Sequence, residues 1–389
     1  MTHQQIDCDI LIVGAGLVGA STALALHKRG QHVVLLETHL PDLSDATLQQ
    51  GLDPRIFAIS PGNQRFLSTL NGWPEAARMQ AVQKMSVFGD HGGHIEFSAK
   101  ESHTTHLSTI AENRWLLSGL WAELTRQNIT ILSGSRGSHL HTDVQQARVT
   151  LENGDIIQAK LIIGADGANS WVRQQAAINI QVDPYHHHGV VANFKCEHDH
   201  QGVAYQWFKD GEILAYLPLP NQHMSMVWST TQPDKLLSLS PEALAAAVAE
   251  RGQHTLGQLT VVTPANAFEL RLIRPESTIA QRILLVGDAA HTIHPLAGQG
   301  VNLGFGDAQA LAQLIGAARD PGQAALLRLY AQRRLEPVRT MQMSCDTLFK
   351  LFGQDKIPLL PWLRNTGLSL TNRFTPIKKK LIAHAMGLQ

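Results

Sequence analysis

The segment at residues 7–37 constrains the fold of this chain more than any other part of the sequence. It combines two short, uninterrupted apolar runs, at 10–13 and 33–36, which are typical of buried strands in a parallel sheet. Between these runs, apolar residues recur at helical spacing, at Ala20, Ala23, Leu24 and Leu26. The order strand, turn, helix, strand predicts a β-α-β unit at the start of an α/β domain.

The turn of this unit, Gly-Ala-Gly-Leu-Val-Gly at 14–19, has the spacing of a dinucleotide-binding loop. Gly14 permits the sharp turn, Gly16 lets a pyrophosphate approach the backbone, and Gly19 lets helix and sheet pack closely. Glu37 ends the second strand, where a carboxylate can accept hydrogen bonds from a ribose. We therefore expect these four residues to bind a dinucleotide. The alternative is a glycine-rich turn of another α/β protein, with Glu37 as a surface acid.

Composition bounds the class of protein. The 389 residues suit two or three domains, and the formal net charge of +0 argues against nucleic acid as the main partner. The cysteines, Cys8, Cys196 and Cys345, are odd in number and far apart, which suits a reducing cytoplasm. The apolar stretch at 10–26 follows a leader without Lys or Arg and is broken by glycines, so we do not expect a signal peptide. No other stretch is long enough to span a bilayer.

Two later loops carry an acid where a strand ends. Asp288 follows the apolar run at 283–286, and a glycine-containing loop with Asn302 then leads into a helical pattern. Such a segment can present backbone N–H groups and a helix N-terminus to a flat anionic ligand, and a reduced flavin is one. Asp166 ends the run at 161–165, where α/β sheets bind ligands, although it could simply cap a helix. Arg55 could reach cofactor phosphates or the flavin, or form a loop salt bridge.

The middle of the chain changes character. Strand-like runs separated by turn residues fill residues 184–275, which predicts an antiparallel sheet inserted into the nucleotide domain. We interpret His186, His187 and His188 as a solvated turn, because adjacent side chains diverge and no acidic or Cys partner has metal-ligand spacing; we expect no metal. Residues 357–363 and 373–382 combine apolar and cationic residues, which fits a peripheral membrane contact or a helix packed on the main body.

These patterns predict a division of the chain into six segments. Residues 1–80, 111–183 and 276–340 form the dinucleotide-binding domain, 81–110 and 184–275 form the substrate domain, and 341–389 form a helical C-terminal region.

Three motifs together resemble a known family. Residues 14–19, 166–173 and 287–304 are similar to the dinucleotide fingerprint, the Asp-Gly motif and the Gly-Asp motif of flavin-dependent aromatic hydroxylases of the p-hydroxybenzoate hydroxylase type. Within that group, residues 294–304 look like the signature of the ubiquinone-biosynthesis hydroxylases. The segments at 53–55, 112–114 and 363–388 fit the same subfamily, so the resemblance covers nearly the whole chain.

The resemblance implies an α/β fold with a Rossmann-like FAD-binding domain, an inserted antiparallel-sheet substrate domain and a helical C-terminal region. It implies one non-covalent FAD, with NAD(P)H as a transient electron donor. The implied cofactor-binding residues are Gly14, Gly16, Gly19, Glu37, Arg55, Arg114, Asp166, Asp288, Gly298, Gly300, Val301 and Asn302. The implied catalytic residues are His294, Pro295, Gly298 and Tyr216. Spacing does not select the base that activates the substrate among Tyr216, His223 and His294.

The resemblance also implies a reaction: O₂-dependent hydroxylation of the ring of a polyprenylated phenol or quinol in ubiquinone biosynthesis. Residues 185–188, 191–193 and 213–219 most resemble the 2-polyprenylphenol hydroxylases that act at ring C5. However, Phe268-Glu269-Leu270 departs from the usual Phe-Pro-Leu, which leaves the ring position open. Candidates for the path of the prenyl tail are Trp207, Phe208, Tyr216 and Trp228.

Other functions stay open at this point. They are hydroxylation at another ring position, a flavoprotein oxidase or reductase of a lipid, and a scaffold that keeps FAD for stability. A lipid substrate would also bring the chain to an inner-membrane surface or into a lipid-biosynthesis complex.

Overall fold

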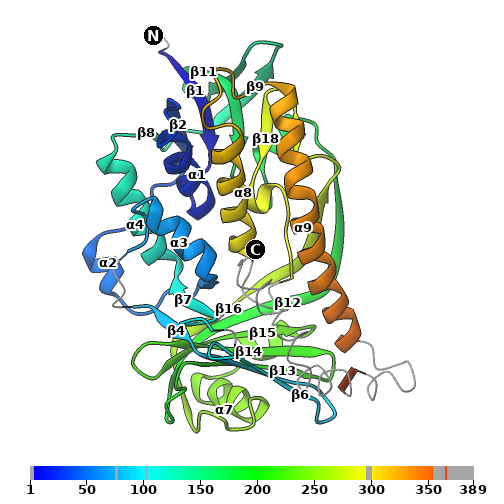
Figure 1. The fold of residues 1–389 in the computed structure, drawn as a ribbon. Helices are drawn as coiled ribbons and strands as arrows, with labels where there is room; N and C mark the ends of the chain where they lie inside the picture. Colours follow the sequence, from blue (N-terminus) through cyan, green and yellow to red (C-terminus); the bar gives the residue numbers. More distant parts are fainter. Residues whose placement is uncertain (1–3, 75–77, 102, 295–299, 354–363, 366–389) are drawn as a thin grey trace.

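The computed structural model describes residues 4–74, 78–101, 103–294, 300–353 and 364–365, and its strands form three sheets within this part of the chain (Figure 1). The largest sheet runs in the order β17-β18-β11-β1-β2-β8, with β10 paired to β11 and β9 to β10. Its strands are β1 (Gln5–Val13), β2 (Val33–Glu37), β8 (Thr130–Ser133), β9 (Gly137–Thr142), β10 (Ala147–Leu151), β11 (Ile156–Gly164), β17 (Ile279–Ala280) and β18 (Ile283–Leu285).

The predicted β-α-β unit is confirmed. β1 pairs in parallel with β2 on one side and with β11 on the other, and β11 pairs in parallel with β18. The helices that pack on one face of this sheet are α1 (Leu17–His27), α3 (Pro61–Thr69), α4 (Asn113–Arg126) and α8 (Gly300–Leu314). Strands β9 and β10, together with α5 (Trp171–Gln175), cover the other face. Because parallel strands end at the same edge, the loops after β1, β11 and β18 lie side by side.

A seven-stranded sheet forms the second layer, in the order β16-β12-β15-β14-β13-β5-β6. Its strands are β5 (Lys84–Phe88), β6 (His94–Ser98), β12 (Ile180–Cys196), β13 (Val203–Lys209), β14 (Glu212–Leu219), β15 (His223–Thr230) and β16 (Leu259–Pro275). All its pairs are antiparallel except β5 with β13. The predicted inserted antiparallel sheet is therefore present, and residues 84–98 join it from outside the insertion.

The two faces of this sheet have different neighbours. Helices α6 (Pro233–Leu237) and α7 (Pro241–Arg251) pack on the face that points away from the first sheet (Figure 1). The opposite face looks toward a small sheet of β3 (Ile56–Ile59), β4 (Gln80–Val82) and β7 (Ser108–Glu112). Arg78, just before β4, donates a hydrogen bond to the Leu48 carbonyl of the short helix α2 (Asp45–Gln49). Trp207, Tyr216 and Trp228 lie in the core under α7, so they are not on the face that looks toward the first sheet.

The three consecutive histidines are not a solvated turn, and that prediction is wrong. They lie within β12, where an irregularity in the pairing with β16 falls between Pro184 and His187. His186 takes a positive φ of 55° at this bulge, and His187 is buried behind it. A bulge adds one residue to a strand and redirects the side chains that follow.

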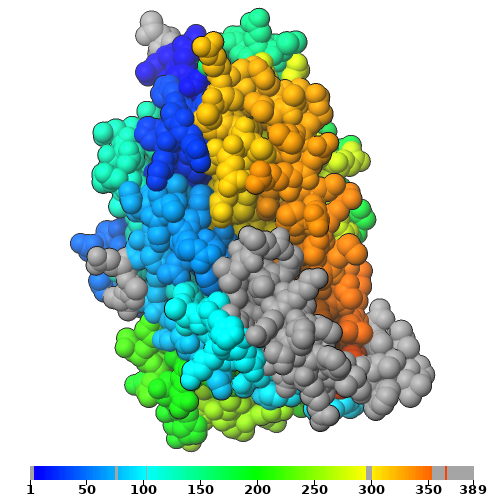
Figure 2. Space-filling view, in the orientation of Figure 1, coloured from blue at the N-terminus to red at the C-terminus, as the bar shows by residue number. Residues whose placement is uncertain are grey.

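The chain returns to the first layer and ends in a long helix. α9 (Ala324–Gly353) packs on α8 at its start and reaches the seven-stranded sheet at its end, where Phe352 stacks on Phe208 at 4.1 Å. Figure 2 shows it in orange along one side of the molecule. Residues 341–353 thus confirm part of the predicted helical region; 357–363 and 373–382 lie outside the described residues. Among the described residues, no helix combines the length and the hydropathy that a membrane span needs.

Candidate active site

The glycine turn after β1 leaves room for a ligand at one position and none at the others. A Cβ at Gly14, whose φ is +98°, would lie 2.5 Å from the Ala165 carbonyl oxygen, and one at Gly19 would lie 1.9 Å from that of Gly14. A Cβ at Gly16 would meet nothing within 4 Å. Gly16 is also the N-cap of α1, and no side chain caps that helix end. The first turn of α1 thus has no side-chain cap among the described residues and lies beside an open position, as a pyrophosphate site requires.

Glu37 lies beside this turn, at the end of β2. Its carboxylate accepts hydrogen bonds from the Ala15 N–H at 2.7 Å and the His39 N–H at 3.1 Å. The acid is thus held at the same edge of the sheet as the turn, which is the place where a ribose would follow a bound pyrophosphate.

The Asp166 loop and the Asp288 loop are fastened to each other by Arg173. This side chain, 3% exposed, donates to the Ala168 carbonyl at 2.7 Å and to the Ala289 carbonyl at 3.0 Å. The Asp166 carboxylate accepts from the Ser170 hydroxyl at 2.5 Å and from the Val172 N–H at 3.1 Å, so it also caps the first turn of α5. Burial raises the pKa of Asp166, although these hydrogen bonds oppose the rise. Both the ligand-site and the helix-cap interpretations of Asp166 are compatible with this position.

Asp288 and Arg55 form an unsatisfied pair of opposite charges. Asp288, in the 3-10 turn η1 (Gly287–Ala289), is exposed, and no described residue hydrogen-bonds to its carboxylate. Burial nevertheless raises its pKa, against the attraction of His291 and Arg55. Water therefore reaches this carboxylate although protein atoms lie close around it. The Arg55 guanidinium is close enough to act on it, is exposed, and makes no hydrogen bond to a described residue.

A buried carboxylate, Asp307 of α8, holds the Asp288 loop in place. It is 0% exposed and accepts hydrogen bonds from the Gly287 N–H at 2.9 Å, His291 Nε2 at 2.7 Å and Arg334 Nε at 2.6 Å. Burial works to raise the pKa of Asp307, but His291, Arg334 and these hydrogen bonds outweigh it and lower that pKa. The motifs in the sequence do not identify this residue. The one signal for it is an acidic residue on the apolar face of a predicted helix, which indicates a buried charge with partners elsewhere in the fold.

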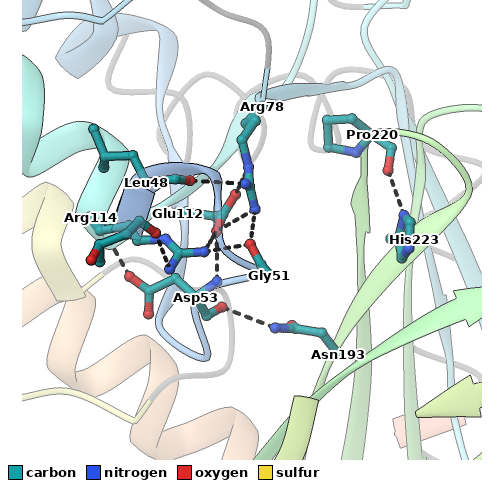
Figure 3. Close-up of polar contacts among 10 residues, drawn as sticks. Leu48, Gly51, Asp53, Arg78, Glu112, Arg114, Asn193, Pro220 and His223 are labelled. Carbon is teal, nitrogen blue, oxygen red and sulfur yellow. Dashed lines mark hydrogen bonds and ion pairs between the residues drawn. The ribbon is translucent and has the colours of Figure 1, made fainter. Parts of the chain in front are cut away.

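A second cluster joins the segments at 53–55 and 112–114, which are far apart in the sequence (Figure 3). The buried Asp53 carboxylate accepts from the N–H groups of Arg55 at 2.8 Å and Arg114 at 3.0 Å, so it caps α4 from outside that helix. Glu112, fully buried, accepts from the Asp53 N–H at 2.6 Å and from Arg78 Nε at 2.6 Å. The Arg114 guanidinium is engaged by Glu112 and by the carbonyls of Thr47 and Gly51. Arg114 therefore supports the loop that carries Arg55.

The N-terminus of α8 is anchored by Asn302. Its side chain accepts from the Ser60 N–H and from Asn63 Nδ2, both at 2.9 Å, and donates to the Ala58 carbonyl at 2.8 Å. Val301 packs in the core of the first layer, and a Cβ at Gly300 would lie 3.9 Å from Ile293. The other two residues predicted for this loop, Pro295 and Gly298, lie outside the described residues.

The three candidate bases occupy different parts of the structure. His294 is 2% exposed and lies between β12, β15 and α9, on the side of the seven-stranded sheet that faces the first layer. His223 bonds to the Pro220 carbonyl at a sheet turn (Figure 3). Tyr216 lies under α7, where its hydroxyl donates to the Val248 carbonyl at 2.5 Å. The structure does not bring Tyr216 to the site, so it is not a candidate base.

Comparison with known proteins identifies the family. An FAD-binding domain family model matches residues 7–344 of the chain. The chain is 35% identical to the 3-demethoxyubiquinol 3-hydroxylase of Escherichia coli, with 100% of both chains covered. It is 34% identical to the ubiquinone hydroxylase UbiL of Rhodospirillum rubrum, over 97% of this chain and 89% of the relative. This chain belongs to the FAD-dependent ubiquinone-biosynthesis hydroxylases. It is an aromatic-ring monooxygenase, and FAD is its cofactor.

Solved structures show that this hydroxylase shares its fold with other flavoproteins. The p-nitrophenol 4-monooxygenase of Pseudomonas putida superposes with a TM-score of 0.79 at 18% identity, with 97% of each chain covered. HpxO of Klebsiella pneumoniae, solved with FAD and uric acid, gives a TM-score of 0.76 at 18% identity, again with 97% of each chain covered. At this identity the likeness shows the fold alone.

Proposed function

We propose that this hydroxylase adds a hydroxyl group to the ring of a polyprenylated phenol or quinol during ubiquinone biosynthesis. The observation that carries the proposal is the meeting of three strand-end loops at one edge of the first sheet: the glycine turn, the Asp166 loop and the Asp288 loop. All three belong to a chain that matches a ubiquinone-pathway hydroxylase over its full length.

The residues on these loops fit FAD. The open N-terminus of α1 would hold the pyrophosphate, and Glu37 would accept hydrogen bonds from the ribose. Asp288 would accept from ribityl hydroxyls, since its carboxylate has no other partner among the described residues. Arg55 would lie beside it as a counter-charge to the cofactor. When bound, FAD supplies the activation of O₂ and the transfer of one oxygen atom to the ring.

The sheet face opposite these loops suits an apolar ligand. Pairing places Val191, Ala215 and Val227 next to one another across β12, β15 and β14, on the same face as Asn193, which bonds to the Asp53 carbonyl at 3.0 Å. All three are partly exposed, whereas the opposite face is buried under α7. Phe268, 46% exposed, lies on the same face, with its ring over Gly189. We place the prenyl tail along this face instead of beside Trp207, Tyr216 and Trp228.

The ring position has two candidates, each favoured by its own observation. The full-length match to a 3-demethoxyubiquinol 3-hydroxylase favours position 3 of a demethoxyubiquinol. The segments at 185–188, 191–193 and 213–219 favour C5 of a 2-polyprenylphenol. We take position 3 as the first candidate, because that comparison covers every part of the chain. NAD(P)H as electron donor, and work at an inner-membrane surface or within a lipid-biosynthesis complex, belong to the same proposal.

Lipid extracts from cells that lack this chain test the proposal directly. Accumulation of a demethoxyubiquinone supports position 3, and accumulation of a 2-polyprenylphenol supports C5. The control is the same strain carrying the wild-type chain, which should restore ubiquinone. An unchanged ubiquinone pool, with no accumulated precursor, would contradict the proposal and favour a flavoprotein oxidase or lipid reductase.

A further inference from the structure

Three buried polar side chains from separate elements form a continuous chain beside the site. His187 Nδ1 lies 3.1 Å from the Ser229 hydroxyl, and that hydroxyl lies 3.4 Å from His294 Nε2. The exposed fractions of His187, Ser229 and His294 are 9%, 3% and 2%. The first comes from β12, the second from β15, and the third from the segment between η1 and α8. These hydrogen-bonded side chains therefore connect the seven-stranded sheet to the segment that leads into the predicted flavin-binding loop.

The donors and acceptors along these hydrogen bonds can be assigned. The Ser229 hydroxyl can both accept a hydrogen bond and donate its one hydrogen, so it can accept from one histidine and donate to the other. His294 Nδ1 is buried and has no hydrogen-bond partner among the residues that the structure describes. A buried N–H without an acceptor costs more than a buried lone pair without a donor, which places the His294 proton on Nε2. His294 then donates to Ser229, Ser229 donates to His187 Nδ1, and His294 Nδ1 is left as a free acceptor.

The free acceptor lies next to the predicted flavin-facing loop. His294 immediately precedes Pro295, and the side chain of its neighbour Ile293 lies 3.9 Å from the Cβ position of Gly300, at the start of α8. Aromatic contacts fix the imidazole: Tyr185 meets it edge-on with ring centres 4.9 Å apart, and Phe349 packs on it at 4.7 Å. An oriented, partnerless nitrogen at this position is placed to receive a proton.

We propose that His294, Ser229 and His187 form a proton relay that removes the hydroxyl proton of the bound phenol or quinol. His294 Nδ1 accepts that proton, and His294 Nε2 passes its own to Ser229. The Ser229 hydroxyl hydrogen moves to His187 Nδ1, and His187 releases its Nε2 proton to solvent. No charge accumulates on His294, and the phenolate that remains is the electron-rich form of the ring. The relay rests on the proposed function, since it needs a phenolic substrate.

The surroundings keep the relay neutral at rest. Burial and the neighbouring His187 lower the pKa of His294 to about 3, and burial also lowers the pKa of His187. The titratable and charged groups that act on His187 and its neighbour Tyr185 are Asp183, His186 and His188 on β12, Glu212 on β14, Arg274 on β16, and Cys345 and Asp346 on α9. Glu212 favours a proton on His187, so the outer end of the relay is the better resting place for a proton in transit.

The relay is tested by Ser229→Ala, which breaks it at the centre. Ser229→Thr keeps a hydroxyl and should preserve function. Ser225→Ala is the matched control: Ser225 lies four residues earlier on β15, is 1% exposed, and its hydroxyl has no partner within the described part of the chain. The probes are 2-geranylphenol and demethoxyubiquinol with a two-isoprene tail, and the experiment uses whichever the wild-type holoenzyme hydroxylates. Two readouts are taken: the ionisation of the bound probe by ultraviolet absorption without reductant, and kcat from pH 6 to 10.

The relay predicts that wild type ionises the bound probe at a pH at least one unit below that of the free probe, which is about 10 for a simple phenol. Ser229→Ala should lose this shift and at least tenfold in kcat at pH 7, and should recover kcat as the pH approaches 10. Ser225→Ala should match wild type, and Ser229→Thr, which keeps the hydroxyl, should retain the shift in ionisation that Ser229→Ala loses. Wild-type ionisation in Ser229→Ala, or an equal loss of kcat at every pH, would overturn the relay while leaving the proposed function intact. Failure of wild type to hydroxylate either probe would overturn both.

Discussion

Replacing Asp307 with alanine should destabilise this hydroxylase more than any exposed substitution on the same side of the molecule. The carboxylate is 0% exposed and accepts hydrogen bonds from Gly287, His291 and Arg334 at 2.6–2.9 Å. Removing it leaves the guanidinium of Arg334, whose side chain is 14% exposed, without its anion. Breaking a buried ion pair from one side costs about 3–5 kcal/mol. We expect a loss of that size in the free energy of unfolding.

Urea unfolding of the apoprotein, repeated at a fixed excess of FAD, measures this loss. FAD binds only the folded state, so the stabilisation that it adds should shrink if the Gly287–Asp288 turn loses its anchor. The control is Glu336→Ala, an exposed acid on α9, which should change stability by less than about 0.5 kcal/mol. Because the pKa of Asp307 is lowered in the folded state, its contribution to the free energy of unfolding is complete at neutral pH and is lost as the pH falls below about 4. The difference in unfolding free energy between wild type and Asp307→Ala should therefore become smaller in acid. A loss below about 1 kcal/mol at pH 7 would refute the reasoning.

Three further predictions follow from single positions. Gly16→Val should leave the thermal stability of the apoprotein unchanged, because its Cβ position is open, and should weaken FAD binding at least tenfold in a fluorescence titration; full FAD affinity would remove the pyrophosphate from this turn. Tyr216→Phe should lower the free energy of unfolding, measured in urea, by about 0.5–1.5 kcal/mol and leave kcat unchanged, because the Tyr216 hydroxyl donates to the Val248 carbonyl under α7. A large loss of kcat would show that Tyr216 takes part in catalysis. His294→Gln should reduce the slope of unfolding free energy against pH, between about pH 3 and 6.5, by up to about 1.4 kcal/mol per pH unit. The reason is that in this range the unfolded histidine binds a proton that the buried histidine does not. Equal slopes in wild type and variant would contradict the low pKa of His294.

Local sequence signals predicted the first layer well. The strands, the turn and the acid of residues 7–37 act within one β-α-β unit, so short-range pattern is enough to place Glu37 beside the glycine turn. The inserted sheet was predicted as a sheet, but its orientation was not. Both of its faces carry apolar residues, and a period of two does not say which face meets a helix. Trp207 and Tyr216 were therefore assigned to the substrate, although α7 covers them.

The clusters that support the site depend on partners far apart in the chain. Asp53 bonds to Arg114, 61 residues away, and Ser229 bonds to His294, 65 residues away. Neither spacing has a pattern that a single sequence can show, because the contacts arise only when the two layers meet. The β12 bulge is a further example: nothing in three consecutive histidines indicates that the middle one turns into the core.

The central claim is that this chain uses FAD to insert one atom of O₂ into the ring of a ubiquinone precursor. The most direct measurement is mass spectrometry of the product formed by the FAD-loaded protein under ¹⁸O₂, with a reduced nicotinamide as donor and demethoxyubiquinol or 2-geranylphenol as substrate. We predict one ¹⁸O atom in the new ring hydroxyl and no incorporation from H₂¹⁸O in the converse experiment. A hydroxyl labelled from water, or consumption of O₂ and donor without a hydroxylated product, would contradict the account.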